Sequence, residues 1–229
     1  MNIKYLVFSI HRKNGEKINC EAAGNLACIT LNDEDLDMLT GGDIIKLLEK
    51  EVSRNTNEEF DKLNISRIIG TILHEIGHLL DLGHVKKTVM SDEYWKIGKY
   101  FVSGGFDQFR CFDKASLSIL NNHKWMNSNN PSTKFIEKVI TFDRTRNRIV
   151  RCEDEIYAIQ IRRFEDGETL YSRIFDDNSY PIKIWTLPGF EKNSPIDHQK
   201  IVLFVMIRAG DTARFVTSVG QIMYKGALQ

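Results

Sequence analysis

The sequence predicts an α+β protein with two domains: a mixed first domain over residues 1–126 and an all-β, sandwich-like second domain over residues 134–229. Apolar residues recur at helical spacing in the first part, whereas period-two alternation dominates the second. Residues 127–133 lie between them, and this polar stretch with one proline is typical of a linker.

The first domain contains two predicted strands and two predicted helices. Residues 4–10 and 26–31 are rich in apolar and β-branched residues, as strands are. Asp43 follows two glycines and precedes an apolar stripe of period 3.6, so we expect a helix over residues 43–51. A longer helix is expected from about Ser66, and its broad apolar stripe indicates that it is buried.

In the second domain, alternating apolar residues predict strands over 157–162 and at intervals through 170–184. Residues 201–207 form a continuous apolar run, which is typical of a central strand buried on both faces. Gly167 and Gly210 stand at turn positions. Six or seven short strands favour a β-sandwich, with a β-barrel as the alternative.

Composition limits the function classes. Lysine and arginine total 31 and aspartate and glutamate total 31, so the basic field that nucleic-acid binding requires is missing. The longest apolar runs fall well short of the ~20 residues of a membrane-spanning helix. The first residues predict no export signal, although a mature or truncated secreted form stays open. The four cysteines are scattered, which favours free thiols over two disulfides.

The predicted long helix carries the motif His74-Glu75-Ile76-Gly77-His78. Two histidines four residues apart project from the same face of a helix, so both can bind one zinc ion. Glu75 stands beside them, close enough to take a proton from a zinc-bound water without being a ligand. The alternative interpretation is a buried helix on which both histidines are hydrogen-bonded within the protein and bind no metal.

A third histidine strengthens the metal hypothesis. His84 lies ten residues after His74, and an unbroken helix would place it about 9 Å beyond His78 along the axis. The helix must therefore stop between these two histidines if they are to share a metal. Asp81 and Gly83 are residue types that tolerate the left-handed conformation at which helices end. We predict a zinc site formed by His74, His78 and His84.

The span from His74 to His84 resembles the extended zinc signature of the metzincin metallopeptidases, H-E-x-x-H-x-x-G-x-x-H. All three histidines and the glutamate match. Asp81 stands where the family has the glycine of the turn, and Val85, which follows the third histidine, matches no well-known subfamily. The resemblance implies a zincin-like fold for residues 1–126 and a zinc-dependent endopeptidase acting on protein or peptide substrates, with Glu75 as general base.

Three further features follow from this resemblance. Met90 would be the methionine of the Met-turn that packs beneath the zinc-binding imidazoles. Residues 111–120 would form the helix that closes the catalytic domain. The strand near residues 24–31 would be the sheet edge that pairs with extended substrate, with a strand covered on that side as the alternative.

Other interpretations stay open. Glu93, fifteen residues after His78, would be the third ligand in another class of zinc peptidase. Tyr94 is a candidate for oxyanion stabilisation, with simple packing favoured. A binding or adhesion protein with an inert zinc domain is the alternative to an enzyme, and the second domain would then bind a protein or glycan partner.

Overall fold

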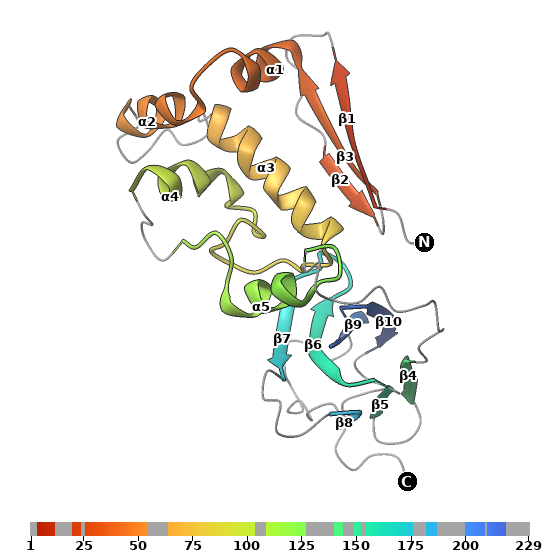
Figure 1. The fold of residues 1–229 in the computed structure, drawn as a ribbon. Coiled ribbons are helices and arrows are strands. Elements are labelled where there is room, and N and C mark those ends of the chain that lie inside the picture. The colour runs from red at the N-terminus through yellow and green to blue at the C-terminus, as the bar shows by residue number, and fades with distance from the viewer. Residues whose placement is uncertain are drawn as a thin grey trace. The chain divides into compact units, whose positions relative to one another are not determined.

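The computed structural model describes residues 4–11, 20–23, 26–54, 64–103, 109–126, 140–143, 149–152, 154–175, 182–186, 200–208 and 210–218. The chain divides into two compact units, Met1–Asp113 and Lys114–Gln229 (Figure 1). The first unit combines helices with a sheet, and the second is built mainly from antiparallel strands. The predicted α+β class is therefore confirmed.

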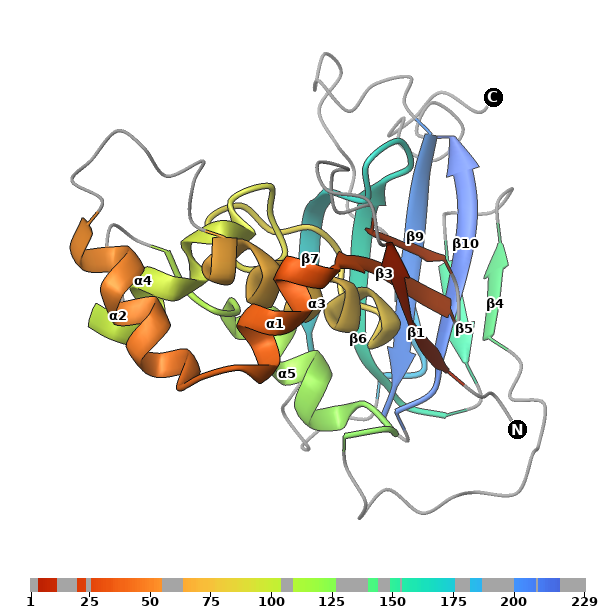
Figure 2. The same cartoon turned by 90° about the horizontal axis from the view of Figure 1, so that it is seen from above.

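A three-stranded sheet with helices on one of its faces makes up the first unit (Figure 2). The middle strand β3 pairs in parallel with β1 and antiparallel with β2. The elements are β1 (Tyr5–His11), β2 (Cys20–Ala23), β3 (Leu26–Asn32), α1 (Asp33–Thr40), α2 (Ile44–Arg54), α3 (Asn64–Leu79), the 3₁₀ turn η2 (Tyr94–Lys96) and α4 (Ile97–Ser103).

Helix α3 packs on the buried face of β3. Its residue Ile68 shares a fully buried apolar cluster with Ile29 and Leu31 of the strand. Burial of each such side chain contributes about 1.5–3 kcal/mol. The long buried helix that the sequence predicts from about Ser66 is confirmed and begins two residues earlier, at Asn64.

The N-terminus of α3 is capped by a carboxylate from another helix. Glu51 of α2 accepts hydrogen bonds from the backbone N–H of Ile65 at 2.8 Å and of Ser66 at 3.2 Å, and from the Ser66 hydroxyl at 3.1 Å. These amides lie in the first turn, where a helix lacks internal acceptors and its dipole favours negative charge. Helix α2 therefore helps to fix where α3 begins.

Helix α1 is an element that periodicity did not predict. Asn32 accepts a hydrogen bond from the Asp35 N–H at 2.7 Å, and the Asp35 carboxylate accepts one from the Asn32 N–H at 3.1 Å. This reciprocal pair is a capping box with aspartate in place of the usual glutamate. The cap residues were a usable signal for this helix.

Of the two alternatives for the strand near residues 24–31, a substrate-pairing edge is wrong for residues 26–29, and a strand covered on that side is what the structure shows there. Strand β3 is hydrogen-bonded to β1 on one side and, over residues 26–29, to β2 on the other, so these residues have no edge left for a substrate. Strand β2 forms the edge next to it instead. The apolar pattern of β3 indicated a strand but held no information on how many neighbours it has.

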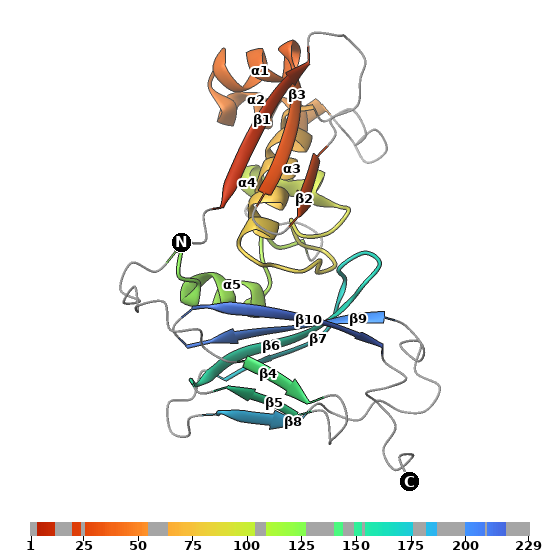
Figure 3. The ribbon, with the colours of Figure 1, turned by 90° about the vertical axis from the view of Figure 1, so that its right-hand side faces the viewer.

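The second unit contains two antiparallel sheets, of strand order β10-β9-β6-β7 and β4-β5-β8. In Figure 3 the four-stranded sheet lies between helix α5 and the three-stranded sheet. The bounds are α5 (Lys114–Asn122), β4 (Ile140–Asp143), β5 (Ile149–Cys152), β6 (Ile156–Arg163), β7 (Thr169–Ile174), β8 (Ile184–Thr186), β9 (Lys200–Ile207) and β10 (Thr212–Ser218).

Residues of both sheets share one apolar core. Val150 of β5 and a row of isoleucine, leucine and valine side chains on β6 and β9 belong to a single buried cluster. Strand β9 pairs with β6 on one side and β10 on the other, as expected of the predicted central strand over 201–207. Gly167 and Gly210 have positive φ angles, so both serve as turns.

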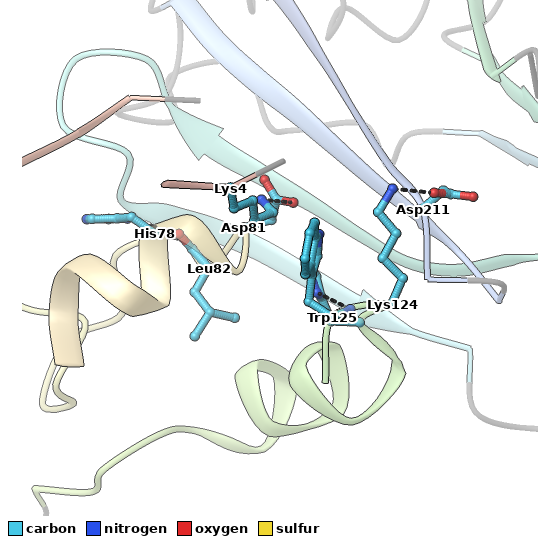
Figure 4. Close-up of polar contacts among 8 residues, drawn as sticks. Lys4, His78, Asp81, Leu82, Lys124, Trp125 and Asp211 are labelled. Atoms are coloured by element: carbon cyan, nitrogen blue, oxygen red, sulfur yellow. Dashed lines mark hydrogen bonds and ion pairs between the residues drawn. The ribbon is translucent and has the colours of Figure 1, made fainter. Parts of the chain in front are cut away.

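Helix α5 belongs to the second unit. Asn122 donates a hydrogen bond to the Ile207 carbonyl at 3.1 Å. Lys124 pairs with Asp211 at 2.7 Å (Figure 4). The helix that the resemblance places in the catalytic domain thus groups with the second unit from Lys114 onward. The predicted linker, residues 127–133, lies outside the described residues.

The structure bears on the predictions about membrane-spanning segments and about the cysteines. Among the described helices, none combines the length and apolarity that crossing a bilayer requires. Cys28, Cys111 and Cys152 are free thiols, and burial raises the pKa of Cys111 above its ordinary value.

Candidate metal centre

The structure brings the three predicted histidines together. The Nε2 atoms of His74 and His78 lie 3.0 Å apart, those of His78 and His84 lie 2.9 Å apart, and those of His84 and His74 lie 3.2 Å apart. No second group of three or more metal-capable side chains occurs among the residues that the structure describes. Three imidazole nitrogens thus converge on one point.

Helix α3 supplies His74 and His78, and the turn after it supplies His84. Leu79 is the last residue of the helix, and Asp81 has φ of 64°. The left-handed residue reverses the chain, so His84 returns toward the two helical histidines. The helix stop predicted between His78 and His84 is confirmed, and Asp81 makes it.

Backbone carbonyls orient two of the imidazoles. Nδ1 of His74 lies 2.8 Å from the Val89 carbonyl oxygen, and Nδ1 of His78 lies 3.1 Å from that of Leu82. A carbonyl oxygen only accepts, so each Nδ1 carries the proton and donates. Each Nε2 then carries no proton, and its lone pair is directed at the shared point. Metal-binding histidines have this arrangement.

The electrostatics favour neutral imidazole. Burial lowers the pKa of His74, the hydrogen bond to the Val89 carbonyl opposes that effect, and the nearby His84 lowers the pKa further. A neutral imidazole is the form that binds a metal ion.

The donor set fits a zinc ion. Three nitrogens that bind tetrahedral zinc at ~2.0–2.1 Å lie about 3.4 Å from one another, close to the separations of these Nε2 atoms. Three protein ligands with a fourth position left open are the arrangement of catalytic rather than structural zinc sites.

Glu75 occupies the position next to the first histidine on α3. Its side chain is buried, with 6 % of its surface exposed. A carboxylate in such a place is shielded from bulk water and lies close to the histidine cluster along the chain.

Met90 lies against the same helix. The side chain is fully buried, and a Cβ built on Gly77 would lie 2.2 Å from its sulfur. An alanine at position 77 would therefore force Met90, which packs on the helical turn between His74 and His78, to shift. The sequence placed Met90 beneath the histidines by resemblance alone.

Replacing Gly77 with alanine is expected to lower the free energy of unfolding by about 1–3 kcal/mol, because a buried methionine has little room to move. Urea denaturation followed by circular dichroism measures the change. Gly42→Ala is the matched control, since its Cβ would meet Leu47 at an ordinary 3.7 Å. In the double variant with Met90→Ala, the new methyl group fills part of the cavity that the shortened side chain leaves. The loss of unfolding free energy in the double variant should therefore be smaller than the sum of the losses in the two single variants. Full additivity would contradict the contact.

The alternative ligand Glu93 lies elsewhere. Its carboxylate forms an ion pair with Lys96 and is not part of the histidine cluster. The ring of Tyr94 packs beside that of His74, with centroids 5.4 Å apart.

Sequence reasoning missed the partners of the ligands. The carbonyls of Val89 and Leu82 have no side-chain signature, so no residue pattern indicates them. Lys4, whose Nζ lies 3.4 Å from Asp81, also had no signal, because the pair joins residues 77 positions apart.

The fold and the site together define a class: an α+β protein with a three-histidine metal site on one helix and the turn that follows. Residues 50–132 match a family model described as "Putative peptidase family". The histidine cluster lies inside the matched range, so the family match and the geometry point to the same part of the chain.

Comparisons with solved structures and with curated proteins were also made. The chain is similar in structure to wild-type OgpA from Akkermansia muciniphila, with 16% sequence identity and a TM-score of 0.49. The match covers 93% of this chain, which spans 63% of the OgpA chain. No curated protein matches the sequence significantly.

Proposed function

We propose that the chain is a zinc-dependent endopeptidase of the metzincin type, in which His74, His78 and His84 hold the metal ion. The observation that carries the proposal is the convergence of three Nε2 atoms within 3.2 Å, two of them on imidazoles whose Nδ1 donates to a backbone carbonyl. The chemistry that zinc supplies in such a site is Lewis-acid activation of water and of the scissile carbonyl.

Glu75 is the general base in this proposal. It accepts the proton of the attacking water and returns it to the leaving amine. Its burial supports the role, because a carboxylate that is shielded from bulk water meets few water molecules other than one held at the histidine cluster.

An extended substrate would pair with β2. This strand is the edge of the sheet on one side of β3, and backbone hydrogen bonds to such an edge bind a peptide without regard to its sequence. Pairing there would replace the role that the sequence assigned to residues 24–31.

We further propose that residues 134–229, which follow residues 127–133 in the chain, form a β-sandwich that binds a protein or glycan partner. Support comes from the single apolar core shared by the two antiparallel sheets.

Metal analysis of the purified chain, coupled to casein digestion with and without a chelator, tests the peptidase. We expect about one zinc ion per chain, hydrolysis that the chelator abolishes, and recovery when zinc is restored. Zinc-loaded protein that hydrolyses no unfolded protein would favour the binding or adhesion alternative, and hydrolysis that survives metal removal would place the chemistry elsewhere.

A further inference from the structure

The turn that ends α3 has the hydrogen bonds of a Schellman motif. The Leu82 N–H donates to the Gly77 carbonyl at 2.9 Å, and the Asp81 N–H donates to the His78 carbonyl at 3.0 Å. In this motif the left-handed residue is usually glycine, and here it is Asp81, with φ of 64°.

This turn sets the geometry of two ligands. Leu82 belongs to it and presents the carbonyl to which His78 Nδ1 donates. His84 follows two residues later and reaches the shared point only because the chain reverses at Asp81. A small rotation of the turn would therefore move both His78 and His84.

Aspartate is an unusual choice here on electrostatic grounds. The carbonyls at the C-terminus of a helix carry partial negative charge, so a carboxylate there is repelled. The Asp81 side chain is also nearly buried, with 10% exposed, which adds the cost of removing a charge from water. A cation beside the carboxylate would offset both effects.

Lys4 supplies that cation. Its Nζ lies 3.4 Å from the Asp81 carboxylate, and its own side chain is only 12% exposed (Figure 4). The lysine directly precedes β1, at the opposite side of β3 from β2. An ammonium group at this place is attracted both by the carboxylate and by the helix terminus.

We infer that Asp81 and Lys4 are positioning residues of the metal centre: their ion pair holds the turn after α3 in the conformation that aims His78 and His84 at the metal. The inference rests on the proposed zinc site. It gives a reason for a residue other than glycine at the left-handed position, since glycine would form the turn but would lose the link to the residue that precedes β1.

Zinc affinity, measured by competition with a chromophoric chelator on the full chain, tests this role. We expect Lys4→Met and Asp81→Asn each to weaken zinc binding about 10-fold, the size of effect that outer partners of metal ligands have. The double variant should bind zinc no more weakly than either single variant, because each single change already breaks the same ion pair. Lys4→Arg keeps the charge and should retain affinity close to that of the unaltered chain.

Asp81→Gly separates the two roles that Asp81 combines. If the residue serves only to form the turn, glycine will preserve or improve zinc affinity. We expect it to weaken binding as Asp81→Asn does, and the visible spectrum of the cobalt-substituted protein should change in both variants because the histidines shift. Lys46→Met is the matched control, since Lys46 pairs with Asp43 at 3.3 Å on the surface, with the two side chains 79% and 51% exposed.

Circular dichroism of the metal-free variants shows whether each one folds, and the changes at either end of the pair give two independent readings. Unaltered zinc affinity and cobalt spectrum in Lys4→Met or Asp81→Asn overturn the inference alone. An unaltered chain that binds no zinc refutes the metal centre, and the positioning role with it.

Discussion

Replacing His84 with alanine is expected to remove the bound zinc and all measurable hydrolysis. Two histidines remain on α3, but the third donor, whose Nε2 lies 2.9 Å from that of His78, is lost. We expect zinc affinity to fall by more than the roughly 100-fold that marks the upper end for outer partners of metal ligands. Equilibrium competition with a chelator and metal content after dialysis measure the loss.

Glu93→Ala is the control for His84→Ala. Glu93 is the rival third ligand from the sequence, and its carboxylate pairs with Lys96 instead. Zinc content and hydrolysis should therefore persist in this variant. Retention of zinc by His84→Ala together with its loss from Glu93→Ala would exchange the two assignments.

Glu75→Gln should leave zinc content unchanged and reduce hydrolysis by about 10²–10⁴-fold, the usual contribution of a general base. The amide has nearly the shape of the carboxylate, so a side chain that is 6 % exposed keeps its packing. Because glutamine accepts no proton from water, the loss should fall on kcat rather than on KM.

The comparison that matters is between two isosteric changes in one chain. Glu93→Gln changes a glutamate outside the histidine cluster and should retain full activity. Normal turnover by Glu75→Gln would show that another group moves the proton. Loss of zinc in the same variant would instead make Glu75 a ligand or a structural residue.

The sequence predicted that the three histidines come together, because the determinants of that convergence are local. His74 and His78 share a helix face by periodicity alone, and the need for a stop before His84 follows from the rise of the helix. Asp81 was a recognisable stop residue. Each of these steps uses residues within a few turns of one another, where spacing in sequence fixes spacing in the fold.

Non-local pairing was not predictable in the same way. The sequence identified β3 as a strand but left open whether it was an edge or a covered strand, because an apolar pattern does not reveal on how many sides a strand is hydrogen-bonded. The Glu51 cap on α3 and the Lys4–Asp81 pair join elements that are distant along the chain. Helix α1 is a different kind of omission, since the capping signal at Asn32 was local and legible.

The placement of Lys4 and Glu51 bears on attempts to transplant this chemistry. The three histidines, Glu75 and both carbonyl partners lie within residues 74–89, a segment short enough to be grafted onto another protein. The ends of α3, however, are fixed from outside that stretch, by a carboxylate at the start and an ammonium group at the finish. A recipient scaffold would need to provide both charges. It would also need apolar side chains that pack against the helix as Ile29 and Leu31 do.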